Sequence, residues 1–237
     1  MKILHSTTIG TLCLSLVLVL ALAAFPSMAR AQDTLRHEVL LQTTMGDIRV
    51  ALSNATPLHR DNFLENVRKG LYDGVLFHRV ISSFMIQAGD TASRHAQPGQ
   101  LLGDSEEAKT IPAEIRFPQL FHKRGVLAAA REGDSVNPER RSSSMQFYIV
   151  YGRRFTDDML DKVQQRLSSV PGGVELTPEV REAYKKYGGT PHLDGQYTVF
   201  GEVVEGLDVV RDIQWVETDS NDRPLTDVRI NKAVVVK

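Results

Sequence analysis

Short runs of alternating apolar and polar residues dominate this chain, and they predict a protein built mainly of β-strands. The first two runs, Glu38 to Thr44 and Asp47 to Leu52, are joined by a tight turn at Gly46 and therefore predict a hairpin. Further strand-like runs lie at 76–81, 85–88, 125–130, 146–150, 197–203 and 227–236. So many short strands favour an antiparallel barrel or sandwich.

Two segments have helical spacing instead, and we expect them to cover the open ends of the sheet. In the first, Thr56 precedes Pro57, which suits a hydroxyl N-cap followed by proline at the first helical position. The apolar repeat of this helix ends at Gly70. The second segment, 206–213, places its apolar residues on one side.

A charged segment between about 152 and 190 predicts two helices with a break between them. Thr156 and Thr177 can each cap a helix, and the proline and two glycines at 171–173 separate the two patterns. The first helix carries an apolar stripe made of Met159, Val163 and Leu167.

Residues 1–31 have the layout of a secretory signal peptide. A basic start is followed by an apolar run, and Ala29 and Ala31 form a small-x-small cleavage site. The alternative is a retained membrane anchor, but the run is shorter than the roughly 20 residues that a spanning helix needs. We therefore expect an exported protein, periplasmic or otherwise extracytoplasmic, whose mature chain, 32–237, has no membrane span.

Composition limits the partners of that mature chain, which has the length of one domain. The full chain has a net charge of −1, and removal of Lys2 and Arg30 would lower it to about −3, so no positive field favours nucleic acid. The single cysteine, Cys13, lies in the segment to be removed. The mature chain can thus enter an oxidising compartment without forming a disulfide.

The segment from Phe77 to Asp90 holds the most distinctive side chains. Within nine residues it combines one arginine, two large apolar side chains and one glutamine. This set does not suit acid–base chemistry, but it suits a site that holds a small apolar ring while a cation contacts a neighbouring amide. The histidines lack metal-ligand spacing and no nucleophile or phosphate-loop motif occurs, so we expect no metal and no cofactor.

Together with Gln146-Phe147-Tyr148 and residues 193–201, that segment resembles the cyclophilin family of peptidyl-prolyl cis–trans isomerases. The resemblance implies a closed eight-stranded antiparallel barrel with a helix at each end. It also implies an enzyme that needs no cofactor and acts on proline-containing polypeptides. In the family pattern, the strand that corresponds to 146–150 runs almost directly into the turn at Leu193. The segment 152–190 is therefore interpreted as an inserted helical hairpin. We expect this hairpin to be dispensable for catalysis on short peptides.

The resemblance assigns the site residue by residue. Arg79 matches the catalytic arginine, and Gln87 is grouped with it. The substrate-binding positions are Phe84, Met85, Ala130, Arg131, Gln146, Tyr148, His192, Leu193 and Tyr197. Arg131 stands where asparagine is common, and Tyr148 where phenylalanine is usual. Tyr197 replaces a histidine, and His192 replaces the tryptophan of tight cyclosporin binders.

Taken singly, these residues have ordinary interpretations, with the apolar side chains in a core and Arg79 in a surface ion pair. His78 is expected to be structural, because neighbours on a strand face opposite sides. Joint occurrence in family order favours the enzyme, and a non-catalytic peptide-binding or chaperone module using the same groove is the alternative. A third interpretation makes the hairpin a docking or dimerisation element for a partner protein, if its apolar stripe is exposed.

Overall fold

The computed structural model describes residues 36–104 and 109–237. The strands are β1 (Glu38–Thr43), β2 (Gly46–Leu52), β3 (Arg79–Ile81), β4 (Met85–Ala88), β5 (Thr110–Ile111), β6 (Val126–Ala129), β7 (Ser142–Ser143), β8 (Phe147–Val150), β9 (Val199–Glu205) and β10 (Ile230–Val235). The helices are α1 (Pro57–Arg68), α2 (Asp157–Ser168), α3 (Pro178–Tyr187) and α4 (Leu207–Ile213), with 3₁₀ turns η1 (Thr91–His95) and η2 (Pro191–Leu193). The predicted signal peptide, including Cys13, lies outside the described residues. No helix in the described part of the chain has both the length and the hydropathy of a membrane span.

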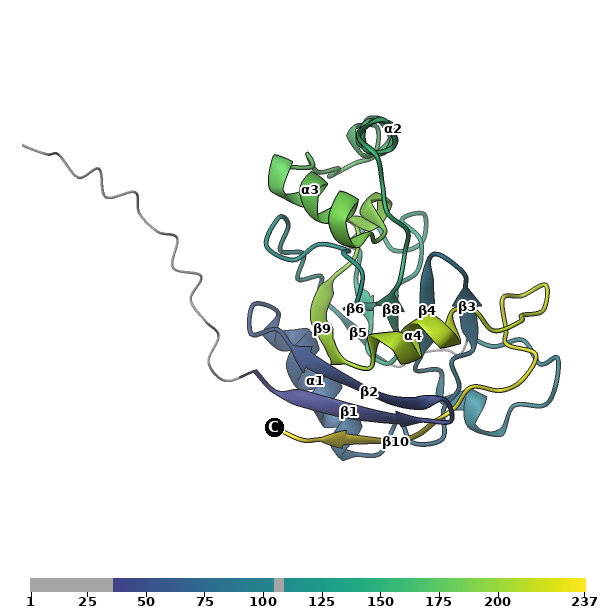
Figure 1. The fold of residues 1–237 in the computed structure, drawn as a ribbon. Coiled ribbons are helices and arrows are strands. Elements are labelled where there is room, and N and C mark those ends of the chain that lie inside the picture. The colour runs from purple at the N-terminus through teal and green to yellow at the C-terminus, as the bar shows by residue number, and fades with distance from the viewer. Residues whose placement is uncertain (1–35, 105–108) are drawn as a thin grey trace, which may run out of the picture. The chain divides into compact units, whose positions relative to one another are not determined.

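Eight strands form one curled antiparallel sheet in the order β10-β1-β2-β9-β6-β8-β4-β3, and β5 and β7 form a separate pair (Figure 1). The predicted β1–β2 hairpin is confirmed. The edge strands β3 and β10 approach each other through the irregular backbone that precedes them. Phe77 N donates to Val228 O and Ile230 N donates to Val75 O, both at 2.8 Å. Among the described residues the sheet is therefore a half-barrel joined across its seam by these bonds, and no regular strand pair closes it.

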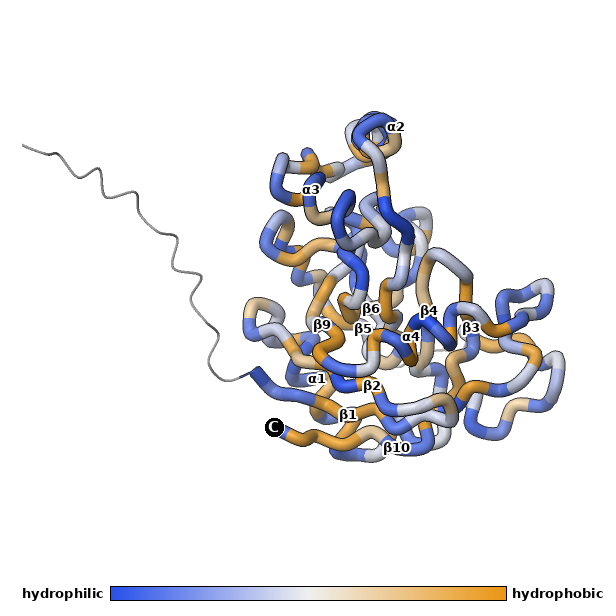
Figure 2. The backbone as a smooth tube through the Cα atoms, in the orientation of Figure 1, coloured by the Kyte–Doolittle hydropathy of each residue, from blue (hydrophilic) through white to orange (hydrophobic). Residues whose placement is uncertain are grey.

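The central strands are buried on both faces, so they separate two apolar layers. All four residues of β8 are buried. Phe147 and Ile149 face the main core, which is packed beneath α1, whereas Tyr148 and Val150 belong to a second apolar cluster on the opposite face. This alternation follows from the two-residue period of a strand. Figure 2 shows apolar residues along β1, β9 and β10, which enclose the main core.

Helices α1 and α4 pack against the sheet as expected, α1 against β10 and β9, and α4 against β2. The N-cap prediction for α1 was wrong in one respect, because the Thr56 side chain makes no cap hydrogen bond. The buried carboxylate of Glu114 takes its place, accepting from Leu58 N at 3.2 Å and His59 N at 3.0 Å. It also bonds His59 Nδ1 at 2.7 Å. An acceptor 56 residues away in sequence leaves no local signal at the helix start.

Both helices of the predicted hairpin are present, and their caps are the expected ones. The hydroxyls of Thr156 and Thr177 accept from the third residue of each helix, at 3.4 Å in both cases. Leu160, Leu167 and Tyr184 are buried in a third apolar cluster that also includes Phe117 and Phe121 of the β5–β6 connection. The stripe residues Met159 and Val163 are partly buried in the same cluster. The stripe therefore packs inside the fold, which removes the reason to expect a partner protein on it.

Candidate active site

One row of side chains crosses three neighbouring strands at the open edge of the sheet. Arg79 on β3 lies opposite Gln87 on β4, and Gln87 lies opposite Tyr148 on β8. Residues directly opposite each other in a sheet project from the same face. The register therefore brings together a cation, an amide and an aromatic ring, three residues that the sequence analysis assigned to the site.

The polar end of this row is a chain of amides that ends at Arg79. Gln146 Nε2 donates to Gly103 O at 2.9 Å, and Gln87 Nε2 donates to Gln146 Oε1 at 3.0 Å. The oxygen of Gln87 then faces Arg79 Nη1 at 3.5 Å, and Arg79 Nε reaches Asp222 Oδ2 at 3.4 Å. Both contacts of the guanidinium are long and its side chain is 43% exposed, so N–H groups remain available to a ligand.

The apolar end of the row is the second apolar cluster, named here the outer cluster. Met85 and Tyr148 are buried in it, at 2% and 4% exposure. The partly buried residues around them include the predicted pocket residues Phe84, Ala130, Leu193 and Tyr197. These partly buried residues surround the buried side chains of Met85 and Tyr148 and still reach solvent. The outer cluster therefore forms an apolar surface beside Arg79 that is exposed to solvent on one side.

His192 extends this surface on the side of the insertion. Its ring lies 5.5 Å from that of Phe84, centroid to centroid, at an angle of 31°. Loss of hydration is the main cause that lowers the pKa of His192 to about 4, and the positive charge of Arg166 acts in the same direction, although the residue is solvent-exposed. A neutral imidazole adds apolar surface and a hydrogen-bonding edge to the groove.

Arg131, which the resemblance assigns to substrate binding, has its charge paired within the protein. Its guanidinium carbon lies 4.5 Å from the ring centroid of Tyr197, and Nε donates to Gln196 O at 2.8 Å. Nη2 pairs with Asp134 at 2.7 Å, and only 4% of the side chain is exposed. The guanidinium of Arg131 therefore packs on the ring of Tyr197 and faces away from solvent.

A buried polar chain beneath the outer cluster escaped the sequence analysis. Tyr184 Oη donates to Asp194 Oδ2 at 2.6 Å, and Asp194 Oδ1 accepts from His122 N at 2.8 Å and Nδ1 at 2.9 Å. His122 Nε2 bonds Tyr148 Oη at 3.0 Å. Burial raises the pKa of both tyrosines well above the usual value, so both hydroxyls keep their protons. The only sequence signal was the place of Asp194 in the turn after Leu193.

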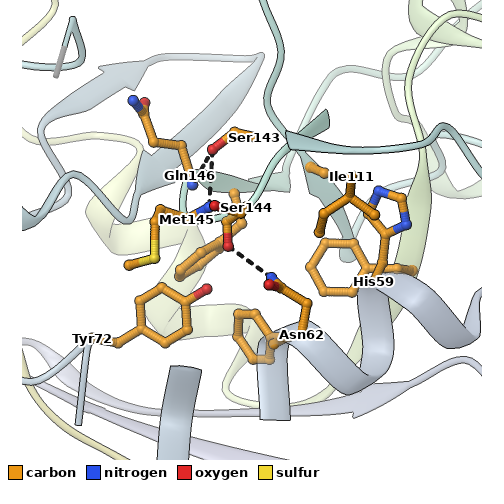
Figure 3. Close-up of a pocket in the computed structure, with 12 residues that line it drawn as sticks. His59, Asn62, Tyr72, Ile111, Ser143, Ser144, Met145 and Gln146 are labelled. Carbon is orange, nitrogen blue, oxygen red and sulfur yellow. Dashed lines mark hydrogen bonds between the residues drawn. The ribbon is translucent and has the colours of Figure 1, made fainter. Parts of the chain in front are cut away.

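A small pocket lies behind Gln146, between α1 and the β7–β8 segment (Figure 3). Asn62 Nδ2 donates to Ser144 O at 2.7 Å, and Ser143 Oγ accepts from Gln146 N at 2.6 Å. Its volume of about 10 Å³ holds roughly one water molecule. The pocket is thus too small for a proline ring, and the bonds around it hold the backbone of Gln146 in place.

His78 is buried beside Arg79, at 3% exposure. Burial lowers the pKa of its imidazole, which keeps it neutral near pH 7. Val80, two residues further along the chain, belongs to the main core. The face of the strand opposite Arg79 is therefore the face that packs into the core. Among the described residues, no group of three or more His, Cys, Asp or Glu side chains is arranged to hold a metal ion.

Comparison with known proteins places these features in one family. A family model described as "Cyclophilin type peptidyl-prolyl cis-trans isomerase/CLD" matches residues 38–235. A Staphylococcus saprophyticus protein named "Putative peptidyl-prolyl cis-trans isomerase" is 32% identical over 203 residues, which are 84% of this chain and 92% of that protein. A Staphylococcus aureus protein of the same name is 32% identical over 211 residues, 88% of this chain and 96% of that protein.

Solved structures show the same fold. The crystal structure of a Cryptosporidium parvum cyclophilin type peptidyl-prolyl cis-trans isomerase matches 86% of this chain and 99% of that chain, with a TM-score of 0.62 at 22% identity. The structure of that protein in the presence of the dipeptide Ala-Pro matches with a TM-score of 0.60 at 21% identity, over 84% and 99% of the two chains.

Proposed function

The chain belongs to the cyclophilin-type peptidyl-prolyl cis–trans isomerase family and is an enzyme of that class, and from this premise we propose that it rotates X-Pro bonds in proteins that fold outside the cytoplasm. The proposal assigns the catalytic contacts to Arg79 and Gln87 and the proline ring to the outer cluster. The extracytoplasmic setting rests on the signal-peptide pattern of residues 1–31.

The chemistry requires no proton transfer and no nucleophile. The peptide C–N bond has partial double-bond character, and its rotation barrier is about 18–20 kcal/mol. A donor that hydrogen-bonds the imide nitrogen as it becomes pyramidal withdraws its lone pair from conjugation and lowers that barrier. Arginine suits this role because it cannot lose its proton.

The outer cluster supplies the other requirement, which is a fixed ring. A proline ring that packs against Met85 and Tyr148 would bury apolar surface away from water, while the carbonyl of the preceding residue stays free to rotate. The amide chain of Gln87 and Gln146 offers hydrogen bonds to the substrate backbone on either side. Because the proline ring is held and the carbonyl can rotate, binding energy is used to lower the barrier to rotation about the X-Pro bond.

The observation that carries this assignment is the register of β3, β4 and β8. Arg79, Gln87 and Tyr148 stand in one row, so a ring beside Tyr148 places its imide bond on the side of the guanidinium. The guanidinium is only loosely held there, with its nearest acceptors at 3.4 and 3.5 Å. This arrangement supports a catalytic groove more than a groove that only binds.

The test is an NMR exchange measurement on a tetrapeptide with one X-Pro bond. Catalytic amounts of the protein are expected to increase the cis–trans exchange rate in proportion to protein concentration, and chemical-shift changes report binding separately. Binding without acceleration would support the non-catalytic peptide-binding module instead. Absence of both would overturn the assigned groove.

A further inference from the structure

The inserted hairpin is connected to the groove through buried polar atoms. Tyr184 lies on α3 at 0% exposure, and its hydroxyl bonds the carboxylate of Asp194. Asp194 follows η2, the turn that carries His192 and Leu193. The insertion is thus bonded directly to the residue that follows the predicted pocket turn.

The same carboxylate sets the protonation of the next member of the chain. Asp194 Oδ1 faces both the backbone N–H and Nδ1 of His122. A carboxylate can only accept, so Nδ1 of His122 carries a proton and donates to it. On the other side of the ring, Nε2 and the hydroxyl of Tyr148 are joined by a hydrogen bond of 3.0 Å.

Two aromatic rings pack against Tyr148. The imidazole of His122 is nearly parallel to the Tyr148 ring, with an interplanar angle of 14° and a centroid distance of 6.1 Å. Tyr197 meets Tyr148 edge-on at 83° and 6.1 Å. The hydroxyl of Tyr148 therefore points toward His122, and this bond fixes the orientation of its ring within the outer cluster.

We propose that Tyr184 is a positioning residue for the isomerase site, acting through Asp194 and His122 to orient Tyr148. This inference rests on the assignment of Tyr148 to the proline pocket. Without the Tyr184 hydroxyl, Oδ2 of a fully buried carboxylate loses its donor, and the carboxylate is free to rotate away from His122. The insertion is then a structural component of the pocket, and the expected dispensability for short peptides is revised.

The test is a double-mutant cycle on kcat/KM for an X-Pro tetrapeptide. Tyr184→Phe removes one oxygen atom and is expected to lower kcat/KM by about 2- to 10-fold, the range of a single buried hydrogen bond. In a Tyr148→Phe background the same substitution should have no further effect, because the end of the chain is already absent. Tyr187→Phe, on the exposed side of the same helix, is the matched control and should leave kcat/KM unchanged.

Each outcome separates this inference from the pocket assignment. Equal losses from Tyr184→Phe in both backgrounds would mean general loosening of the fold and would overturn the positioning role. Wild-type kcat/KM in Tyr184→Phe, combined with a large loss in Tyr148→Ala, would overturn it while the pocket assignment stands. Wild-type activity in Tyr148→Ala would overturn the pocket assignment itself.

A second variant keeps the test decisive if Tyr184→Phe does not fold. Asp194→Asn preserves the shape of the turn and the acceptor for His122, but it removes the charge that holds Tyr184. It is expected to lower kcat/KM in the wild-type background and to have little effect beside Tyr148→Phe. A loss of equal size in both backgrounds would contradict the proposed chain.

Discussion

Replacing Arg79 with alanine should separate catalysis from stability. The contacts of its guanidinium in the folded protein are long, 3.4 Å to Asp222 and 3.5 Å to Gln87, and 43% of the side chain is exposed. Loss of such a pair costs at most about 1 kcal/mol of folding free energy. A charge-assisted bond to the imide nitrogen in the transition state is worth about 1.5–3 kcal/mol, so kcat/KM should fall roughly 10- to 150-fold.

The assay is NMR exchange or protease-coupled isomerisation of an X-Pro tetrapeptide, with thermal unfolding measured on the same samples. Arg49→Ala is the matched control, because Arg49 also forms an exposed ion pair, at 3.1 Å to Glu205, but lies on β2 away from the groove. The control should keep full activity. An Arg79→Ala protein that stays folded and retains wild-type kcat/KM would refute the role of the guanidinium.

Four further predictions concern stability, its pH dependence, export and ligand preference. Glu114→Gln should lower the free energy of unfolding, measured by chemical denaturation, by about 2–4 kcal/mol. The reason is that the substitution weakens both the α1 cap and the buried pair with His59. A decrease smaller than about 0.5 kcal/mol would contradict this expectation. Because burial lowers the pKa of His59 and His78, the unfolded chain takes up these protons at a higher pH than the folded chain does, so stability should fall as the pH drops from 7.5 to 5.5. A flat or rising unfolding temperature over that range would speak against it. Intact mass of protein from the exported fraction should correspond to a chain that begins at Gln32, and a mass that includes the preceding segment would mean a retained anchor. His192→Trp should tighten cyclosporin binding in a calorimetric titration, because an indole adds apolar area beside the groove, and nanomolar binding by the unmodified protein would argue against this assignment.

The sequence predicted the parts of the site that depend on spacing along one strand. The two-residue period of a strand was enough to place Gln146 and Tyr148 on the same side, and the structure adds the pairing of β4 with β8 that sets Gln87 opposite Tyr148. The Glu114 cap and the bond between Tyr184 and Asp194 could not be predicted. They join residues on different elements, and which acceptor reaches an unpaired donor depends on packing, which a local pattern does not encode.

Arg131 illustrates a different limit. The resemblance assigns this residue to substrate binding, yet its guanidinium is covered and paired with Asp134 and Tyr197. A family position predicts where a Cα lies more reliably than where a long side chain points, because several rotamers reach different partners. The direction of this side chain therefore became clear only in the folded protein.

The two apolar layers on either side of β8 affect how the protein can diverge. Phe147 and Ile149 belong to the main core, and Tyr148 and Val150, which alternate with them, belong to the outer cluster. Substitutions at the second pair therefore change the outer cluster and leave the packing of the main core in place. Since most natural sequences lie just above the stability needed for function, that separation allows the outer cluster to vary while the main core keeps the fold intact.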